Sequence, residues 1–154
     1  MRATAAAAAP RNRLALRHLL SAAGSSPAAA AAAVNRYAER RSAGDAAAWA
    51  DLAKHYAAIP SGGKEAALID LLKQNPQEKK LVFVHHRDTL ASLAALLRDH
   101  GIDFALFEGG LSGPDKDAAI TAFRDHLPVL LSTESGGEGR NIQFCNTLIN
   151  FDVP

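Results

Sequence analysis

Four short apolar runs in the second part of the chain place the strongest limit on its fold. The run Leu81–Val84 is unbroken rather than alternating, as expected of a strand that is buried on both faces. Further candidate strands follow at 104–107, 129–131 and 147–151. Strands that alternate with helices over short connections predict an α/β fold, with a parallel sheet flanked by helices and right-handed crossovers.

Signals at the helix ends support this order. Asp88 is expected to cap a helix that Gly101 ends, and a helix over 64–74 precedes the first strand. The segment Ser112–Asp115 is expected to open the helix that carries Ile120 and Phe123.

The first part of the chain has a different composition. Of 33 alanines, 24 lie in residues 1–60, and this part carries eight basic and three acidic side chains against nine and thirteen in the rest. Helices are expected over 11–22, over 27–43 with Ser26 as N-cap, and from Asp45 onward. The sequence therefore predicts an Ala-rich helical extension or linker at 1–61 and a separate α/β lobe at 62–154.

Several classes of protein are disfavoured. No run of 18 or more large apolar residues suggests a membrane span, and the single cysteine, Cys145, excludes an internal disulfide framework and a cysteine-based zinc site. His85 and His86 are adjacent, so on a strand they point to opposite faces and are not expected to share a metal ion. A reducing, intracellular setting is the simplest interpretation.

Polar and glycine residues gather where the predicted strands end. In open parallel sheets, ligands bind at the carboxyl ends of the strands, so a functional edge is expected there. The segments at these ends are His85–Arg87, Glu108–Gly110, Ser132–Glu134 and Asp152.

The stretch Ser132–Asn141 is the most informative of these. Its closely spaced glycines would let backbone N–H groups approach an anion, and its hydroxyls could bond phosphate oxygens. A tight strand-to-helix turn would need the same glycines, and both interpretations stay open. No Gly-Lys-Ser/Thr sequence follows, so the stretch is not a Walker A loop.

Taken together, these blocks resemble the C-terminal RecA-like lobe of Swi/Snf-type ATPases in helicase superfamily 2. The resemblance covers residues 62–154 and rests on ordered segments rather than on one motif. These segments are Lys64–Leu68, Lys80–Leu90, Glu108–Ser112, Val129–Gly139, Asn141–Gln143 and Leu148–Pro154. It implies a parent protein that is an ATP-dependent translocase on double-stranded DNA.

The resemblance also implies roles for individual residues, none of them catalytic or metal-binding. Two groups are implied: nucleic-acid-binding residues His85, Arg87, Gly109, Gly110, Ser132 and Thr133, and ATP-cleft residues Gly137, Glu138, Gly139, Arg140 and Asn141.

Two positions depart from the family pattern. Arg140 stands where an aliphatic residue is usual, and Lys116 stands where an arginine is usual. A guanidinium cannot be buried unpaired without a large penalty. Arg140 is therefore expected to reach solvent, to pair with an acid such as Glu134 or Glu138, or to contact a phosphate.

The sequence holds neither a Walker A lysine nor the arginine-bearing sixth motif of this family. Those groups hold Mg²⁺ and the triphosphate or stabilise the transferring phosphoryl group. The resemblance therefore implies a fragment that is inactive alone and uses ATP and Mg²⁺ only with an N-terminal RecA-like lobe. Its expected partners are double-stranded DNA and that lobe, without a membrane, in the cytoplasm (at the nucleoid in a bacterium). A non-enzymatic DNA- or protein-binding module that retains one lobe is the alternative.

Overall fold

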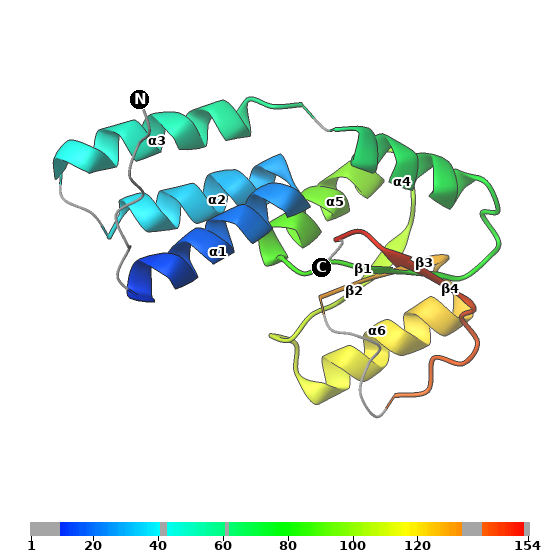
Figure 1. Cartoon of the computed structure of the whole chain (residues 1–154). Coiled ribbons are helices and arrows are strands. Elements are labelled where there is room, and N and C mark those ends of the chain that lie inside the picture. Colours follow the sequence, from blue (N-terminus) through cyan, green and yellow to red (C-terminus); the bar gives the residue numbers. More distant parts are fainter. Residues whose placement is uncertain (1–9, 41–42, 61, 134–139, 153–154) are drawn as a thin grey trace. The chain divides into compact units, whose positions relative to one another are not determined.

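The computed structural model describes residues 10–40, 43–60, 62–133 and 140–152. The chain divides into two compact units, Met1–Ile59 and Pro60–Pro154 (Figure 1).

The first unit is helical and has an alanine core. Ser26 accepts a hydrogen bond from the Ala29 N–H at 3.1 Å, which confirms its predicted role as N-cap. Asp45 lies inside the first turn of its helix, so its predicted role as N-cap is wrong. Small side chains let helices approach closely but bury little area, which explains a core made of Ala22, Ala29 and Ala33 with Leu19 against it. The helices are α1 (Pro10–Ser25), α2 (Pro27–Ala38) and α3 (Ala43–Ala57).

The second unit is the predicted α/β lobe. Its four described strands are all parallel and lie in the order β2-β3-β1-β4, which confirms the predicted sheet. The elements in chain order are α4 (Gly63–Lys73), β1 (Lys80–Phe83), α5 (Arg87–Asp99), β2 (Phe104–Phe107), α6 (Gly113–Asp125), β3 (Val129–Ser132) and β4 (Thr147–Asn150).

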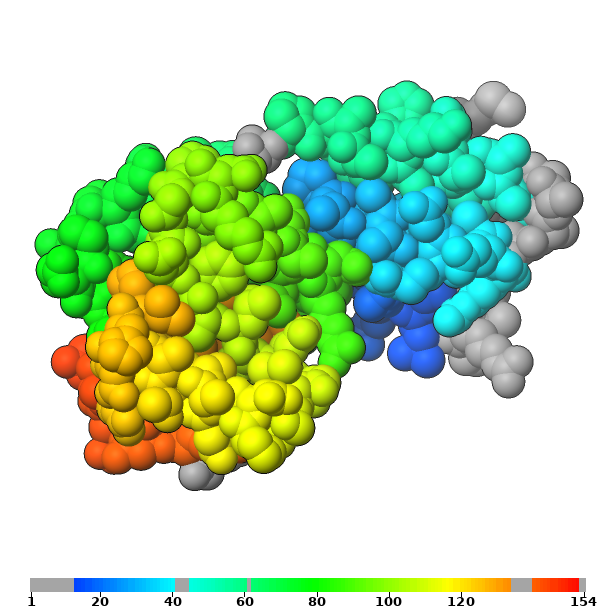
Figure 2. Space-filling view, turned by 180° about the vertical axis from the view of Figure 1, so that it is seen from behind, coloured from blue at the N-terminus to red at the C-terminus, as the bar shows by residue number. Residues whose placement is uncertain are grey.

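Helices cover both faces of this sheet. Val82 and Leu131 belong to the core cluster that includes α4 and α5, whereas Leu81 and Leu130 belong to the cluster that includes α6. Successive strand residues point to opposite faces, so unbroken apolar runs supply both clusters. The helix α6, yellow in the figures, covers one face of the sheet and forms part of the lobe's outer surface (Figures 1 and 2).

The helix ends match the expected signals at two of three positions. Ser112 accepts a hydrogen bond from the Asp115 N–H and caps α6, and Gly101, at φ 65°, follows the end of α5. The predicted cap at Asp88 is wrong: α5 begins at Arg87, after the extended residue His86. Asp88 instead lies in the first turn of α5, where its negative charge complements the helix dipole.

Candidate functional site

The carboxyl ends of the strands meet at one edge of the sheet, as the sequence predicts. Phe83 at the end of β1 is in register with Ser132 of β3 and Asn150 of β4, and Phe107 of β2 is in register with Ser132. The residues that follow these positions therefore lie along a common line, which we call the carboxyl edge. The opposite side of the sheet, where the strands begin, is the amino edge.

Two of the predicted nucleic-acid-binding segments touch at the carboxyl edge. A Cβ atom at Gly110 would lie 3.3 Å from Nη2 of Arg87, so the loop backbone passes close beside the guanidinium. Gly109, Gly110, Arg87 and His85 are all exposed. The close approach brings a cation and open backbone together from segments more than twenty residues apart in the sequence.

The end of β3 is less accessible. The Ser132 side chain is only 1 % exposed, and its carbonyl accepts a hydrogen bond from Val84 N–H at 2.9 Å. Thr133 is half-buried, and its N–H donates to the Phe107 carbonyl at 3.1 Å. Of these two predicted residues, Thr133 is thus the one that a ligand could reach directly.

Arg140 is held against α6. Its Nε lies 2.8 Å from Oδ1 of Asp117, its Nη2 lies 3.4 Å from the Gly113 carbonyl, and its guanidinium stands 5.6 Å from the centre of the Phe107 ring. The predicted pairing with an acid is thus confirmed, while Glu134 and Glu138, the acids named as examples, lie outside the described residues. Sequence reasoning missed Asp117 because 23 positions separate it from Arg140 and only the fold brings them together.

Of the remaining predicted ATP-cleft residues, only Asn141 is among the described residues. Asn141 is exposed, and its Oδ1 accepts a hydrogen bond from the Gln143 N–H at 3.1 Å. Gly137, Glu138 and Gly139 lie outside the described residues.

Sequence reasoning also missed the contact between two charged residues at the carboxyl edge. Asp152 follows β4, and its Oδ2 accepts a hydrogen bond from the His85 N–H. Lys64, near the start of α4, places its Nζ 4.0 Å from the other carboxylate oxygen, Oδ1. The only sequence signal was the position of Asp152 directly after the last predicted strand.

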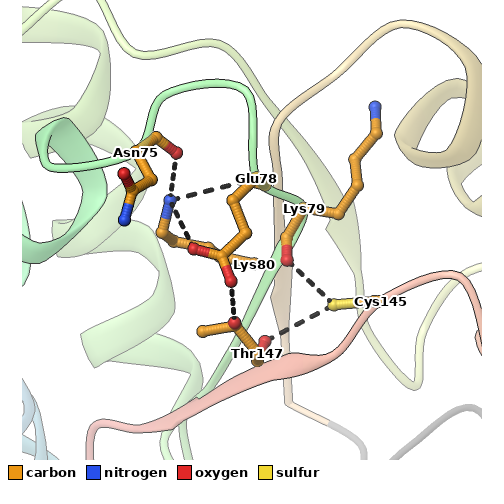
Figure 3. A network of polar contacts seen from close by, with 6 residues as sticks. All are labelled: Asn75, Glu78, Lys79, Lys80, Cys145 and Thr147. Carbon is orange, nitrogen blue, oxygen red and sulfur yellow. Dashed lines mark hydrogen bonds and ion pairs between the residues drawn. The ribbon is translucent and has the colours of Figure 1, made fainter.

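At the amino edge, a network of polar contacts joins the starts of β1 and β4 (Figure 3). The buried Lys80 ammonium donates to the Asn75 carbonyl and lies 3.8 Å from a Glu78 carboxylate oxygen. The other Glu78 oxygen accepts from the Thr147 hydroxyl. Cys145 donates to the Lys79 and Thr147 carbonyls at 3.2 and 3.4 Å, consistent with a structural thiol.

Within residues 10–40, 43–60, 62–133 and 140–152, no group of three His, Cys, Asp or Glu side chains could hold a metal ion. None of the helices described in those ranges is long and apolar enough to cross a membrane.

The sequence is similar to those of two bacterial proteins. The chain is 38% identical over 96 residues to the uncharacterized ATP-dependent helicase YqhH of Bacillus subtilis, covering 62% of this chain and 17% of that protein. It is 43% identical over 91 residues to the RNA polymerase-associated protein RapA of Sodalis glossinidius, covering 56% of this chain and 9% of RapA. The chain thus spans less than a fifth of the length of either relative.

A solved structure agrees with these relatives. The C-terminal part of the Fun30 ATPase domain matches with a TM-score of 0.56 and 32% identity, covering 60% of this chain and 32% of that one. The model of the helicase conserved C-terminal domain matches residues 63–154, which hold the whole sheet and its carboxyl edge. The chain therefore belongs to the helicase conserved C-terminal domain family, with a RecA-like lobe of the superfamily 2 Swi/Snf type.

Proposed function

We propose that the chain is the C-terminal lobe of an ATP-dependent translocase on double-stranded DNA. In this proposal it contributes contacts to the DNA backbone and one wall of the ATP cleft. The observation that carries the proposal is the carboxyl edge, where Arg87 and the Gly109–Gly110 loop converge beside Thr133 in a lobe of helicase type.

The DNA contacts follow from the chemistry of these groups. A guanidinium, a loop of exposed backbone N–H groups and a hydroxyl are the donors that commonly bind phosphate oxygens. His85 and Gly109 add exposed groups to this surface, and Ser132 is buried beneath it at the end of β3. Such contacts fix the orientation of the lobe on a duplex without reading its sequence.

The ATP wall is proposed at Gly137–Asn141. The exposed Asn141 amide can donate and accept hydrogen bonds, and Arg140 adds a positive charge beside it. Bound ATP and Mg²⁺ would supply the phosphoryl group and the charge neutralisation that phosphoryl transfer needs. The sequence holds no Gly-Lys-Ser/Thr loop, so we propose that the chain alone does not hydrolyse ATP and works with an N-terminal RecA-like lobe.

The relatives suggest where such a protein acts. RapA is by name associated with RNA polymerase, so we propose a cytoplasmic, nucleoid-associated protein that works on DNA in a bacterium.

One observation favours a second candidate, a non-enzymatic DNA- or protein-binding module. Helices α1 and α2, with Arg40 just after α2, line a hollow of about 470 Å³ whose lining includes the apolar Leu14 and Leu19 and the basic Arg36 and Arg40. A module of this kind would bind through the helical unit and keep the α/β lobe as a scaffold.

Two measurements test the proposal. Fluorescence anisotropy should show salt-dependent binding to duplex DNA that is tighter than to single-stranded DNA or RNA of the same sequence. Purified chain should show no DNA-stimulated ATP hydrolysis, and calorimetry should give a nucleotide Kd weaker than about 10 μM, or roughly 7 kcal/mol. DNA-stimulated turnover that survives repurification would contradict the proposed inactivity.

A chimera separates the two candidates. Residues 63–154 of this chain can replace the matching segment of YqhH, so that the host would supply the Walker A lysine and the sixth motif that this chain lacks. The chimera should retain DNA-stimulated ATP hydrolysis if the chain is a translocase lobe. A folded chimera that binds DNA but never hydrolyses ATP would favour the non-enzymatic module.

A further inference from the structure

Asp152 carries an unusual buried atom. Its side chain is 8 % exposed, and Oδ1 is buried without a hydrogen-bond partner, alone among the side-chain oxygens and nitrogens of the described residues. The second carboxylate oxygen accepts a hydrogen bond from the His85 N–H. Buried polar atoms without a partner are rare in folded proteins, so this one requires a physical explanation.

Lys64, on a segment remote in sequence, forms an ion pair with this carboxylate. Its Nζ lies 4.0 Å from Oδ1, within reach of an ion pair but too far for a hydrogen bond, and 4.6 Å from the centre of the Phe151 ring. Oδ1 itself has almost no exposed surface, so a bound ligand could not reach it in this conformation. This oxygen can therefore affect a ligand only through its neighbours in the chain.

We infer that Lys64 and Asp152 are positioning residues of the carboxyl edge. Lys64 compensates the buried charge of Asp152, which would otherwise be strongly destabilising. Asp152 in turn fixes the backbone of His85, two residues before Arg87. The three residues link the start of α4 to the ends of β1 and β4, and so set where His85 and Arg87 stand.

The consequence for DNA rests on the proposed function. If His85 and Arg87 contact a duplex, loss of Lys64 or Asp152 weakens binding although neither touches the DNA. The competing explanation is a direct phosphate contact by Lys64, whose side chain is 43% exposed. The two explanations give opposite signs for Asp152, because removing a negative charge should otherwise strengthen binding to a polyanion.

The test uses the full chain and a short DNA duplex in fluorescence anisotropy, with affinities corrected for the folded fraction. Lys64→Met should weaken binding by about tenfold, equivalent to about 1.4 kcal/mol, because displaced donors lose part of their phosphate contacts. Lys64→Arg should restore affinity to within about threefold of the wild type, since it keeps the charge. Lys73→Met, at the other end of α4, removes the same charge and should change affinity by less than about twofold.

Asp152→Ala should also weaken binding, with the salt dependence unchanged in both variants. If Asp152→Ala does not fold, Asp152→Leu takes its place, because it fills similar space without an acceptor for the His85 N–H, and should likewise weaken binding. Tighter binding of the Asp152 variant, together with a salt slope reduced by about one in Lys64→Met, would overturn the inference in favour of a direct contact. Wild-type affinity in both variants would overturn it as well.

A spectroscopic readout does not depend on DNA. The His85 amide proton should shift upfield in Asp152→Ala and move in Lys64→Met, whereas it should stay in place in Lys73→Met. An unmoved His85 amide in Lys64→Met overturns the inference. If the wild-type chain does not bind duplex but the variants show these amide shifts, the proposed function is refuted and the positioning role is supported.

Discussion

The polar groups at the strand ends are paired differently at the two edges of the sheet. At the amino edge, Lys80, Glu78 and Thr147 satisfy one another or nearby backbone carbonyls. At the carboxyl edge, Arg87 and the Gly109–Gly110 loop face solvent. The difference teaches that sequence polarity alone does not mark a site; polarity that the chain leaves available to a ligand does.

Truncating a side chain at the centre of the sheet should destabilise both edges equally. Leu131 is fully buried in β3, between β2 and β1. Leu131→Ala should lower the free energy of unfolding by about 2–5 kcal/mol, through lost burial and a residual cavity. Urea denaturation measures the loss, and duplex binding should fall with the folded fraction. Leu71→Ala, at a half-exposed position of α4, is the control and should cost less than about 1 kcal/mol.

Disruption of the polar network at the amino edge should lower the stability of the fold without lowering its affinity for duplex DNA. Lys80→Met removes the ammonium that the Asn75 and Glu78 carbonyls accept from, and stranded buried acceptors cost about 1–3 kcal/mol. Urea denaturation should show this loss, while anisotropy should show wild-type duplex affinity per folded molecule. Reduced affinity of the folded variant would contradict the assignment of this edge to stability alone.

The carboxyl edge should show the reverse. Arg87→Ala should reduce the salt slope of duplex binding by about one, as expected when one phosphate contact is lost. Its free energy of unfolding should stay within about 0.5 kcal/mol, because the side chain is exposed. Arg98→Ala supplies the control, since Arg98 lies in the last turn of the same helix, toward the amino edge, and should leave the slope unchanged. Equal slopes in both variants would remove Arg87 from the DNA surface.

Replacement of Arg140 should change neither the free energy of unfolding nor the salt slope of duplex binding strongly. Its partner Asp117 is exposed, so Arg140→Leu should cost less than about 1 kcal/mol of stability. We expect an unchanged salt slope for duplex binding, because the proposal assigns Arg140 to the nucleotide side of the edge. A slope lower by about one would instead assign it to the DNA side.

The smallest effect is expected at an exposed pair near the end of α6. A hydrogen bond from Arg124 lowers the pKa of Asp125 below its usual value. The pair thus stabilises the fold above the ordinary pKa of an aspartate, and this contribution is lost as pH falls through the lowered value. Melting curves of Asp125→Asn should differ slightly from those of the wild type at neutral pH and converge in acid. A difference that grows in acid would contradict the assignment.

Local patterns predicted most of the fold. The unbroken apolar runs predicted both core clusters, and Ser26, Ser112 and Gly101 predicted helix boundaries from their own chemistry. Asp45 and Asp88 were wrong as caps because each lies within a helix that begins earlier. A carboxylate is equally favourable in the first turn, so residue type does not separate the two positions.

The site was predictable only as a list of segments. Parallel strand order implied that His85, Gly110 and Thr133 share an edge, but not that Arg87 closes on Gly110. The pairs Arg140–Asp117 and Lys64–Asp152 join positions far apart in the chain, so no local pattern contains them. Ser132 shows the converse limit, since its hydroxyl suits a phosphate while its burial depends on tertiary packing.

Amide chemical-shift mapping during titration with duplex DNA tests the contrast between the edges most directly. We predict that the amides of His85, Gly110 and Thr133 shift in proportion to bound DNA, while those of Lys80 and Thr147 stay in place. Shifts confined to the amino edge, or to the helical unit 10–59, would contradict the assignment of the carboxyl edge as the DNA-binding surface.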